Sequence, residues 1–161
     1  MLKYDRWQRA SIPLGRAMAE AHKGRWGAPM NYVDAIVPIP IHPKRFRDRG
    51  FNQAVLLARE VSGAIGTPIM ESAVRIRHTP AQARISAAER WRNLQDAFQV
   101  PDRASVEGAR LLLIDDVLTS GSTAHHCAEA LKGAGAREVS VLTATRELAK
   151  DVGNLSPVDA V

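Results

Sequence analysis

The 161-residue sequence contains one cysteine, few aromatic residues and no apolar run long enough to cross a membrane. A single cysteine, Cys127, excludes an internal disulfide and a cysteine-rich metal site, and it suits a reducing compartment. The N-terminus lacks the apolar segment of a secretory signal. No lysine follows a glycine as in a GK[ST] loop, and GxGxxG does not occur. We therefore expect a cytoplasmic protein, with no membrane partner and neither of these nucleotide-binding loops.

The charge balance favours anionic partners. The chain has 22 basic and 17 acidic residues and a net charge of +5, which describes a mixed surface rather than a polybasic tail. A phosphorylated small molecule and a nucleic acid fit this charge equally well. The length predicts one domain over residues 1–161, with a helical edge segment (1–32), a core (33–146) and a tail (147–161).

The most informative stretch is LLLIDDVLTSGST, residues 111–123. Its four aliphatic residues, 111–114, predict a strand that is buried on both faces, as in a parallel sheet covered by helices. Asp115 and Asp116 follow at once. The small hydroxyl-rich loop 119–123 then enters a helical segment, so its backbone N–H groups and hydroxyls are suited to bind a phosphate.

A second informative stretch follows a predicted strand at residues 33–39. Pro38 and Pro40 bracket the strand end, and a stiff turn through Pro43 leads into a basic run. Parallel strands point their carboxyl ends at the ligand crevice, so this run is predicted to face the same site as the acidic pair. Its basic residues are Lys44, Arg45, Arg47 and Arg49.

The remaining pattern alternates helices and strands. Ser11 and Pro13 predict the start of an N-terminal helix, and residues 24–30 resemble a loop. Further helices are predicted from residue 51 to the glycines at 63 and 66, from the capping box of Ser86 and Glu89 to residue 94, and over residues 124–135. Further strands are predicted over residues 67–76, 97–100 and 138–145. The polar, arginine-rich segment after residue 77 predicts a flexible lid loop.

Cysteine and histidine are two other residue types that can act as nucleophiles or metal ligands. Cys127 is predicted to pack against the sheet as a small apolar residue rather than to act as a nucleophile. His125 and His126 are neighbours in a helix and diverge, so they are not expected to form the two-histidine metal face that i, i+4 spacing gives.

Three motifs in order resemble one family. They are LLLIDDVLTSGST, the stretch VPIPIHPKRFRDRGFNQA at residues 37–54, and the Thr79, Gln82, Arg90, Asn93 and Phe98 set. The first resembles the PRPP-binding motif of type I phosphoribosyltransferases, and together they resemble the ComF/GntX group of phosphoribosyltransferase-like proteins. The resemblance implies the α/β fold of type I phosphoribosyltransferases: a mostly parallel sheet, flanking helices and a flexible lid loop.

The resemblance also implies roles for individual residues. Asp115 and Asp116 would bind the ribose hydroxyls and orient Mg2+, directly or through ligand or water, and with Lys44 and Arg45 they form the predicted catalytic set. The 5-phosphate would be bound by Thr119, Ser120, Gly121, Ser122 and Thr123, and pyrophosphate by Ile41, His42, Lys44 and Arg45. The lid would carry Arg77, Thr79, Gln82, Arg84, Arg90 and Asn93.

The implied reaction is displacement of pyrophosphate from PRPP by a nitrogen nucleophile, with Mg2+ as cofactor. Thr119 stands where 6-oxopurine salvage enzymes have a catalytic aspartate, which argues against hypoxanthine or guanine as acceptor. Family members commonly carry an N-terminal zinc ribbon of four cysteines. This chain has none, so it is expected to be a truncated or naturally short form.

Two alternatives to an enzyme stay open. The chain could bind PRPP or another ribose-5-phosphate nucleotide as a non-catalytic regulator. It could also bind single-stranded DNA during competence, although the scarcity of aromatic residues provides few stacking platforms. Among oligomeric states a dimer is favoured.

Overall fold

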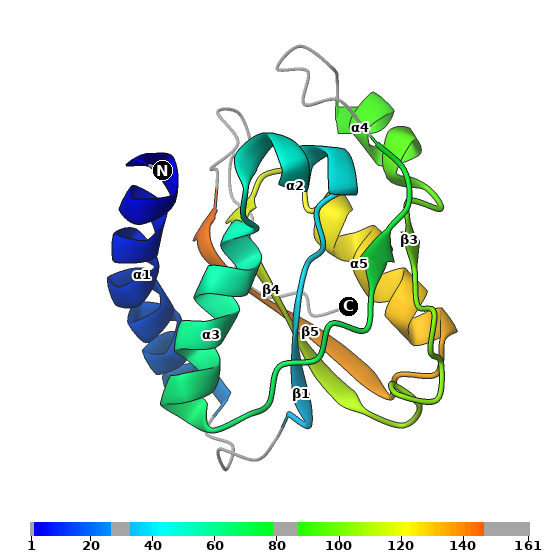
Figure 1. Ribbon diagram of the computed structural model, residues 1–161. Coiled ribbons are helices and arrows are strands. Elements are labelled where there is room, and N and C mark those ends of the chain that lie inside the picture. The colour runs from blue at the N-terminus through cyan, green and yellow to red at the C-terminus, as the bar shows by residue number, and fades with distance from the viewer. Residues whose placement is uncertain (1, 27–32, 79–86, 147–161) are drawn as a thin grey trace, which may run out of the picture.

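The computed structural model describes residues 2–26, 33–78 and 87–146, and it alternates helices with strands (Figure 1). The elements, in chain order, are α1 (Leu2–Trp26), β1 (Ala35–Pro38), α2 (Pro43–Arg49), α3 (Gln53–Ile65), β2 (Val74–Arg75), α4 (Ala87–Leu94), β3 (Phe98–Gln99), β4 (Arg110–Leu118), α5 (Ser122–Gly133) and β5 (Glu138–Arg146).

A parallel sheet forms the centre of the molecule. Its strands run in the order β1-β4-β5, with Ala35 opposite Leu111 and Leu111 opposite Val139. The parallel strands predicted around residues 33–39, 111–114 and 138–145 are confirmed, although β1 is shorter and β4 longer than expected. The predicted α/β fold class with a mostly parallel central sheet is likewise confirmed.

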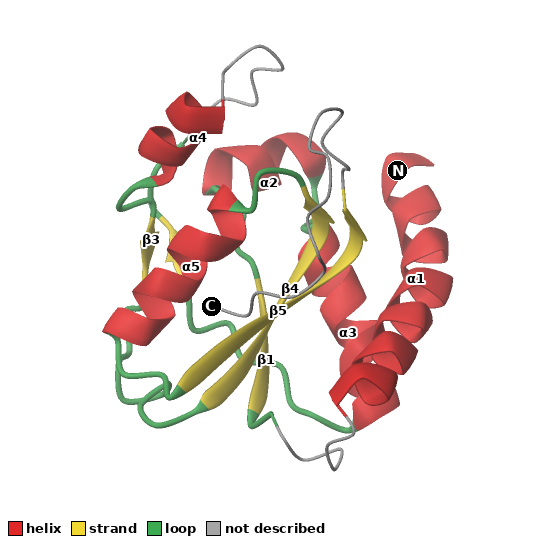
Figure 2. Ribbon diagram, turned by 180° about the vertical axis from the view of Figure 1, so that it is seen from behind, coloured by secondary structure: helices red, strands yellow, loops and turns green. Residues whose placement is uncertain are grey.

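Helices cover both faces of this sheet (Figure 2). Helices α1 and α3 lie on one face, and α5 lies on the other together with the β2–β3 pair. Side chains of β4 alternate between the two layers because successive residues of a strand point to opposite faces. Leu111 and Leu113 pack on the α5 side, while Leu112 and Ile114 pack on the α1 and α3 side. All four are at most 1% exposed, which confirms the prediction of a strand buried on both faces.

Helix α3 has clear start and stop signals. The Asn52 side chain accepts a hydrogen bond from the Ala54 N–H at 3.0 Å and so caps the first turn. Gly66 ends the helix with a φ of 74°, a left-handed conformation that glycine adopts without a Cβ clash. The prediction of a helix from residue 51 to the glycines at 63 and 66 is confirmed.

Helix α1 begins earlier than predicted. It starts at Leu2 and contains Pro13 in its interior, so Ser11 and Pro13 do not mark its beginning, and it continues through residues 24–26, which had been predicted as loop. The helix packs closely on α3: a Cβ built on Gly15 would lie 2.3 Å from Cβ of Glu60. Tertiary packing against α3 therefore outweighs the local start signal.

The predicted strand at residues 67–76 is wrong in extent. Ile69 forms only an isolated parallel bridge to Ile36. The regular strand β2 contains two residues and pairs antiparallel with β3, where Arg75 lies opposite Phe98. The shorter strand expected over residues 97–100 is confirmed as β3. Within the described residues, no helix is both long and apolar enough to span a membrane.

Candidate functional site

The acidic pair lies inside β4 rather than in a loop behind it. The Asp116 N–H donates to Oδ1 of Asp115 at 2.9 Å, and the Val117 N–H donates to Oδ1 of Asp116 at 2.9 Å. In the sheet, Asp115 lies opposite Thr143 of β5. The strand backbone therefore fixes both carboxylates at the carboxyl edge of the sheet, where the sequence predicted the site.

Burial perturbs the first carboxylate. Burial, together with the neighbouring charge of Asp116, raises the pKa of Asp115 to about 7, while Arg75 acts in the opposite direction. Such a pair resists holding two negative charges unless a cation or a hydrogen-bond donor lies against it. The pair is thus prepared for a cationic or hydroxyl-rich ligand.

The phosphate loop is shorter than predicted because α5 begins at Ser122. Gly121 is the N-cap residue, with a φ of 74° and no side-chain cap bond. Ser120 and Ser122 share a hydrogen bond of 2.6 Å between their hydroxyls. Ser122 and Thr123 therefore belong to the first turn, whose N–H groups are the donors that an anion at a helix N-terminus uses. Thr119 and Ser120 are exposed on the approach to this turn.

The basic run that follows the turn after β1 forms a helix, which was not predicted. Helix α2 begins at Pro43, and Nδ1 of His42 accepts a hydrogen bond from the Lys44 N–H at 3.1 Å. Ile41 precedes this cap and is half-buried, and Lys44 is exposed on the first turn. Arg45 is half-buried and lies near Asp116, whose charge raises the guanidinium pKa against the lowering caused by burial and by Arg49. Arg45 is thus a residue of the basic segment whose charge interacts with the acidic pair.

Asn52 connects the end of β1 to α3. Its Nδ2 donates to the Ile39 carbonyl at 3.0 Å, while its Oδ1 caps α3. The Ile39 N–H in turn donates to the Ile114 carbonyl at 2.9 Å, one residue before the acidic pair. The exit of β1, which leads directly into α2, is therefore held against β4.

Arg75 was not predicted as a site residue, yet it is the most buried cation near the aspartates. It is 9% exposed, and its guanidinium lies 5.5 Å from the ring centroid of Phe98. Burial and the nearby Arg45 lower its pKa, while Asp115 raises it. The sequence signal was an arginine among β-branched residues in the string AVRIR, which we had assigned to an ordinary strand.

Two histidine rings lie among the basic residues. The rings of His42 and His78 lie 5.1 Å apart at 70°. Partial burial lowers the pKa of His42, and His78, Arg75, Arg47 and Lys44 lower it further. These groups surround His42 with positive charge, as an anion-binding surface requires.

The predicted lid residues do not all lie in described parts of the chain. Thr79, Gln82 and Arg84 fall outside the described residues. Arg77 donates from Nη1 to the Gln95 carbonyl at 2.9 Å. Arg90 and the exposed Asn93 belong to α4, the short helix that the sequence predicted. Their roles in a lid stay predictions.

A cavity of about 660 Å³ lies beside α2 and shares Arg75 with the acidic site. Its apolar lining includes Tyr4, whose ring meets Phe51 edge-on at 5.4 Å. Phe46 also lines the cavity and is 50% exposed. The lining of the cavity includes Arg75 but neither aspartate, and it offers a mainly apolar surface.

The donor set suits Mg2+. Two adjacent carboxylates offer hard oxygen ligands, and a divalent cation would relieve the repulsion that raises the pKa of Asp115. The N–H groups around Gly121 are hydrogen-bond donors and cannot coordinate a cation, and the hydroxyls there carry no negative charge. Asp115 and Asp116 are therefore the residues that would hold the metal.

Comparisons with known proteins identify the family of this chain. Residues 47–153 match the phosphoribosyl transferase domain family. Competence protein F of Haemophilus influenzae is 36% identical over 110 residues, which are 67% of this chain and 48% of the relative. DNA utilization protein YhgH of Escherichia coli is 34% identical over 149 residues, 91% of this chain and 65% of the relative. The chain thus spans about half to two thirds of the length of these relatives.

A third relative, competence protein ComFC of Bacillus subtilis, is 35% identical over 112 residues, which cover 69% of this chain and 44% of the relative. Among solved structures, glutamine PRPP amidotransferase from B. subtilis aligns with 85% of this chain and 26% of its own, at a TM-score of 0.56 and 22% identity. That identity supports the fold alone. The chain therefore belongs to the phosphoribosyl transferase domain family, and the resemblance of its motifs to the ComF group is confirmed.

Proposed function

We propose that this chain binds PRPP with Mg2+ at the carboxyl edge of β1 and β4 and transfers the phosphoribosyl group to a nitrogen acceptor. One observation carries the proposal. The charges of Arg45 and Arg75 act on Asp116 and Asp115, and the strand that carries these aspartates leads directly to the first turn of α5, whose N-cap residue makes no side-chain cap bond. A molecule with a phosphate at one end, a ribose diol in the middle and a pyrophosphate at the other end matches this order of charges.

Each part of the site would bind one part of the ligand. The first turn of α5 would bind the 5-phosphate, and the aspartates would accept hydrogen bonds from the ribose hydroxyls. Arg45, Arg75 and the exposed Lys44 would bind the pyrophosphate. Bound Mg2+ would supply further positive charge against the pyrophosphate oxygens.

In the reaction, the acceptor nitrogen forms a bond to ribose C1 as the bond from C1 to the pyrophosphate oxygen breaks. The electron pair leaves with pyrophosphate, and the acceptor nitrogen loses its proton to solvent or a base. The chain contributes mainly by stabilising charge on the leaving group, because Arg45 and Arg75 are cations at a partly buried site. Thr119 offers no carboxylate to an acceptor, so this position does not provide a general base.

The test is a thermal-shift experiment followed by an activity assay. PRPP with Mg2+ should raise Tm by several degrees, as mass action requires for a ligand well above its Kd, and the Asp115→Asn/Asp116→Asn double variant should lose the shift. Asp34→Asn removes a carboxylate from the opposite edge of the sheet, so this variant should keep the Tm shift. If PRPP leaves the wild-type Tm unchanged, the binding proposal is wrong.

Release of pyrophosphate across a panel of bases and amines then separates an enzyme from a non-catalytic regulator. A PRPP-dependent shift without release for any acceptor would support the regulator. This alternative deserves the assay because the relatives are named for competence and DNA utilization rather than for a transfer reaction.

Those same names, with the net charge of +5, make a role next to DNA the next candidate. If the chain binds single-stranded DNA through phosphate contacts, affinity should fall steeply as salt rises. A salt titration with labelled oligonucleotides measures this slope, and weak binding with a flat slope would exclude the DNA role.

A further inference from the structure

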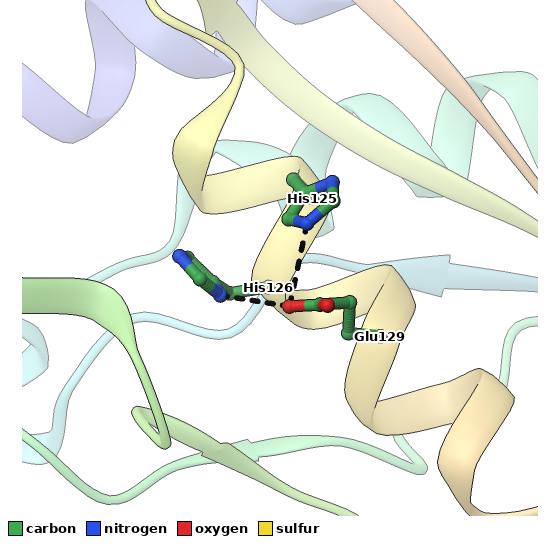
Figure 3. Close-up of side chains that lie close together, drawn as sticks. All are labelled: His125, His126 and Glu129. Atoms are coloured by element: carbon green, nitrogen blue, oxygen red, sulfur yellow. Dashed lines mark hydrogen bonds and ion pairs between the residues drawn. The ribbon is translucent and has the colours of Figure 1, made fainter. Parts of the chain in front are cut away.

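A second group of ionisable side chains lies on α5, outside the acidic site. His125, His126 and Glu129 direct one ligand atom each to a common point, and these atoms all lie within 4.8 Å of one another (Figure 3). Oε2 of Glu129 lies 3.0 Å from Nδ1 of His126 and 3.4 Å from Nε2 of His125. Glu129 is one turn on from both histidines, at i+3 and i+4, which places its carboxylate between them.

This arrangement corrects the sequence-based view of the histidines. The two histidines are neighbours and their side chains leave the helix in different directions, as expected. They therefore do not form the two-histidine face that i, i+4 spacing gives. Glu129 was overlooked, and its carboxylate brings both rings into one cluster. The spacing H-H-x-x-E in the sequence AHHCAE contained the signal.

The hydrogen bonds of His126 define its tautomer. Nε2 of His126 lies 3.1 Å from the carbonyl oxygen of Trp91, and a carbonyl only accepts, so Nε2 carries a proton. In the neutral ring, Nδ1 then presents a lone pair to the Glu129 carboxylate at 3.0 Å. Two lone pairs at this distance repel each other unless a proton or a cation lies between them. Metal-bound histidines have this arrangement, with the second ring nitrogen donating to a backbone carbonyl.

We propose that His125, His126 and Glu129 form a binding site for a divalent transition metal such as Zn2+ or Co2+. Two imidazole nitrogens and one carboxylate oxygen favour such ions over Mg2+ and Ca2+, which prefer oxygen ligands alone. Metal–ligand distances of about 2.0–2.2 Å place tetrahedral ligands about 3.4 Å apart. The contacts of Glu129, at 3.0 and 3.4 Å, are close to this spacing, and the two ring nitrogens lie within 4.8 Å of each other, so the rings would have to approach only slightly to share an ion. Water would complete the coordination.

The surroundings support a small, accessible site. The side chain of His126 is 8% exposed, whereas that of Glu129 is 60% exposed, so an ion can enter from the solvent side. The Trp91 ring lies 4.4 Å from the His125 ring and 4.9 Å from the His126 ring, and it covers both. Cys127 is not a ligand, because it is fully buried and burial raises its thiol pKa to about 12.

The proposed ion would connect two parts of the chain. Trp91 belongs to α4, and the histidines lie in the first turns of α5, directly after the phosphate loop. Fixing the imidazole rings would therefore fix the Trp91 contact and hold α4 against α5. The site is separate from Asp115 and Asp116, so it takes its ion without PRPP.

The test is a titration of the EDTA-treated protein with Co2+ in the absence of Mg2+ and PRPP. In the Asp115→Asn/Asp116→Asn variant, whose acidic site does not compete for the ion, we expect one Co2+ per chain, a visible absorption band that Zn2+ abolishes, and quenching of tryptophan fluorescence. The quenching should fall sharply in Trp91→Phe, because the other two tryptophans lie elsewhere in the sequence. A stoichiometric site with no dependence on Trp91 would overturn the location.

Single substitutions identify the ligands. Glu129→Gln and His125→Gln change side chains that are at least partly exposed, so both variants should fold, and each should weaken Co2+ binding at least about tenfold. His22→Gln removes a histidine of α1 and should bind Co2+ as the wild type does. If Glu129→Gln and His125→Gln bind normally while His78→Gln loses the ion, the metal lies at the His42–His78 pair and the proposal is wrong.

Discussion

Asp34 and Arg110 form a two-point ion pair where β1 and β4 begin. Arg110 Nη2 lies 2.9 Å from Oδ1 of Asp34, and Nε lies 3.2 Å from Oδ2. The Arg110 N–H also donates to Oδ2 at 2.8 Å. These contacts connect the two strands at the edge opposite the acidic site, so they should affect stability and not ligand binding.

The first prediction concerns Asp34→Asn. The hydrogen bonds and charge of Arg110 lower the pKa of Asp34 to about 2. Because the folded-state pKa is lowered, the pair stabilises the fold fully above the ordinary value near 4 and loses this effect as pH falls towards 2. The side chain is largely in water, so we expect a loss of only about 1 kcal/mol at pH 7.

Urea unfolding at pH 7 and pH 2.5 measures this difference, which should shrink at the lower pH. An equal loss at both pH values would contradict the ionic origin. The Tm shift on adding PRPP with Mg2+ should match that of the wild type.

The second prediction has the opposite sign and concerns Asp115→Asn. Burial and Asp116 raise the pKa of Asp115, so the folded state binds its proton more tightly than the unfolded state does. The stability of the metal-free protein therefore falls as pH rises from about 4 to about 7. Asparagine keeps the oxygen that accepts from the Asp116 N–H but carries no charge.

In EDTA at pH 8, Asp115→Asn should be more stable than the wild type by about 1–2 kcal/mol, a typical size for relief of a buried charge. At pH 4.5 the two proteins should have nearly equal stability. Chemical denaturation at both pH values provides the measurement. A variant that is less stable at pH 8 would show that Asp115 is ionised without cost.

The third prediction concerns Arg75→Met. Methionine keeps most of the apolar contact with Phe98 but removes the cation near Asp115. A hydrogen bond to a charged group contributes about 1.5–3 kcal/mol, so the Kd for PRPP with Mg2+ should rise about 10- to 100-fold. Isothermal titration calorimetry measures the change.

Arg16→Gln, on the exposed surface of α1, serves as the charge-matched control and should leave the Kd within about twofold. Normal PRPP affinity in Arg75→Met would show that Arg75 supports only the packing of β2 and β3.

The fourth prediction uses two glycines with the same backbone angle. Gly121 caps α5 and Gly66 ends α3, and both have a φ of 74°. Alanine at either position adds left-handed strain of about 1–2 kcal/mol. Around Gly66 a Cβ would meet nothing within 4 Å, and at Gly121 it would make only an ordinary contact of 3.8 Å with Leu118.

We expect the two alanine variants to lose similar stability in thermal unfolding, because the strain is the same. Only Gly121→Ala should weaken PRPP binding, because only this residue is part of the phosphate loop. Equal ligand affinity in the two variants would argue against a role for the Gly121 turn.

The parts of the fold that were predicted correctly depend on short-range patterns. The burial of Leu111 to Ile114 can be predicted from their apolar composition alone. Asn52 and Gly66 are local signals for the two ends of α3. The acidic pair and the glycine of the phosphate loop were found for the same reason, because all lie within one continuous stretch.

The errors arose where tertiary contacts decide the structure. Ile69 lies beside Ile36 without extending into a strand. Arg75 is a site residue because its charge interacts with Asp115, which is 40 positions away in the chain. Nothing near Leu2 signals that α1 begins there, since its register depends on the contact between Gly15 and Glu60. The His126 tautomer likewise depends on a carbonyl 35 residues distant.

The position of the acidic pair within β4 has a consequence for reorganisation energy. Its backbone is paired with β5 on both sides of Asp116, through Asp115 with Thr143 and Val117 with Thr145, and the Thr145 hydroxyl donates to the Asp116 carbonyl at 3.3 Å. The opposing arginines lie on a seven-residue helix and a two-residue strand, which have far fewer such constraints. Adjustment to a bound ligand should therefore occur on the arginine side, while the carboxylates serve as a fixed reference.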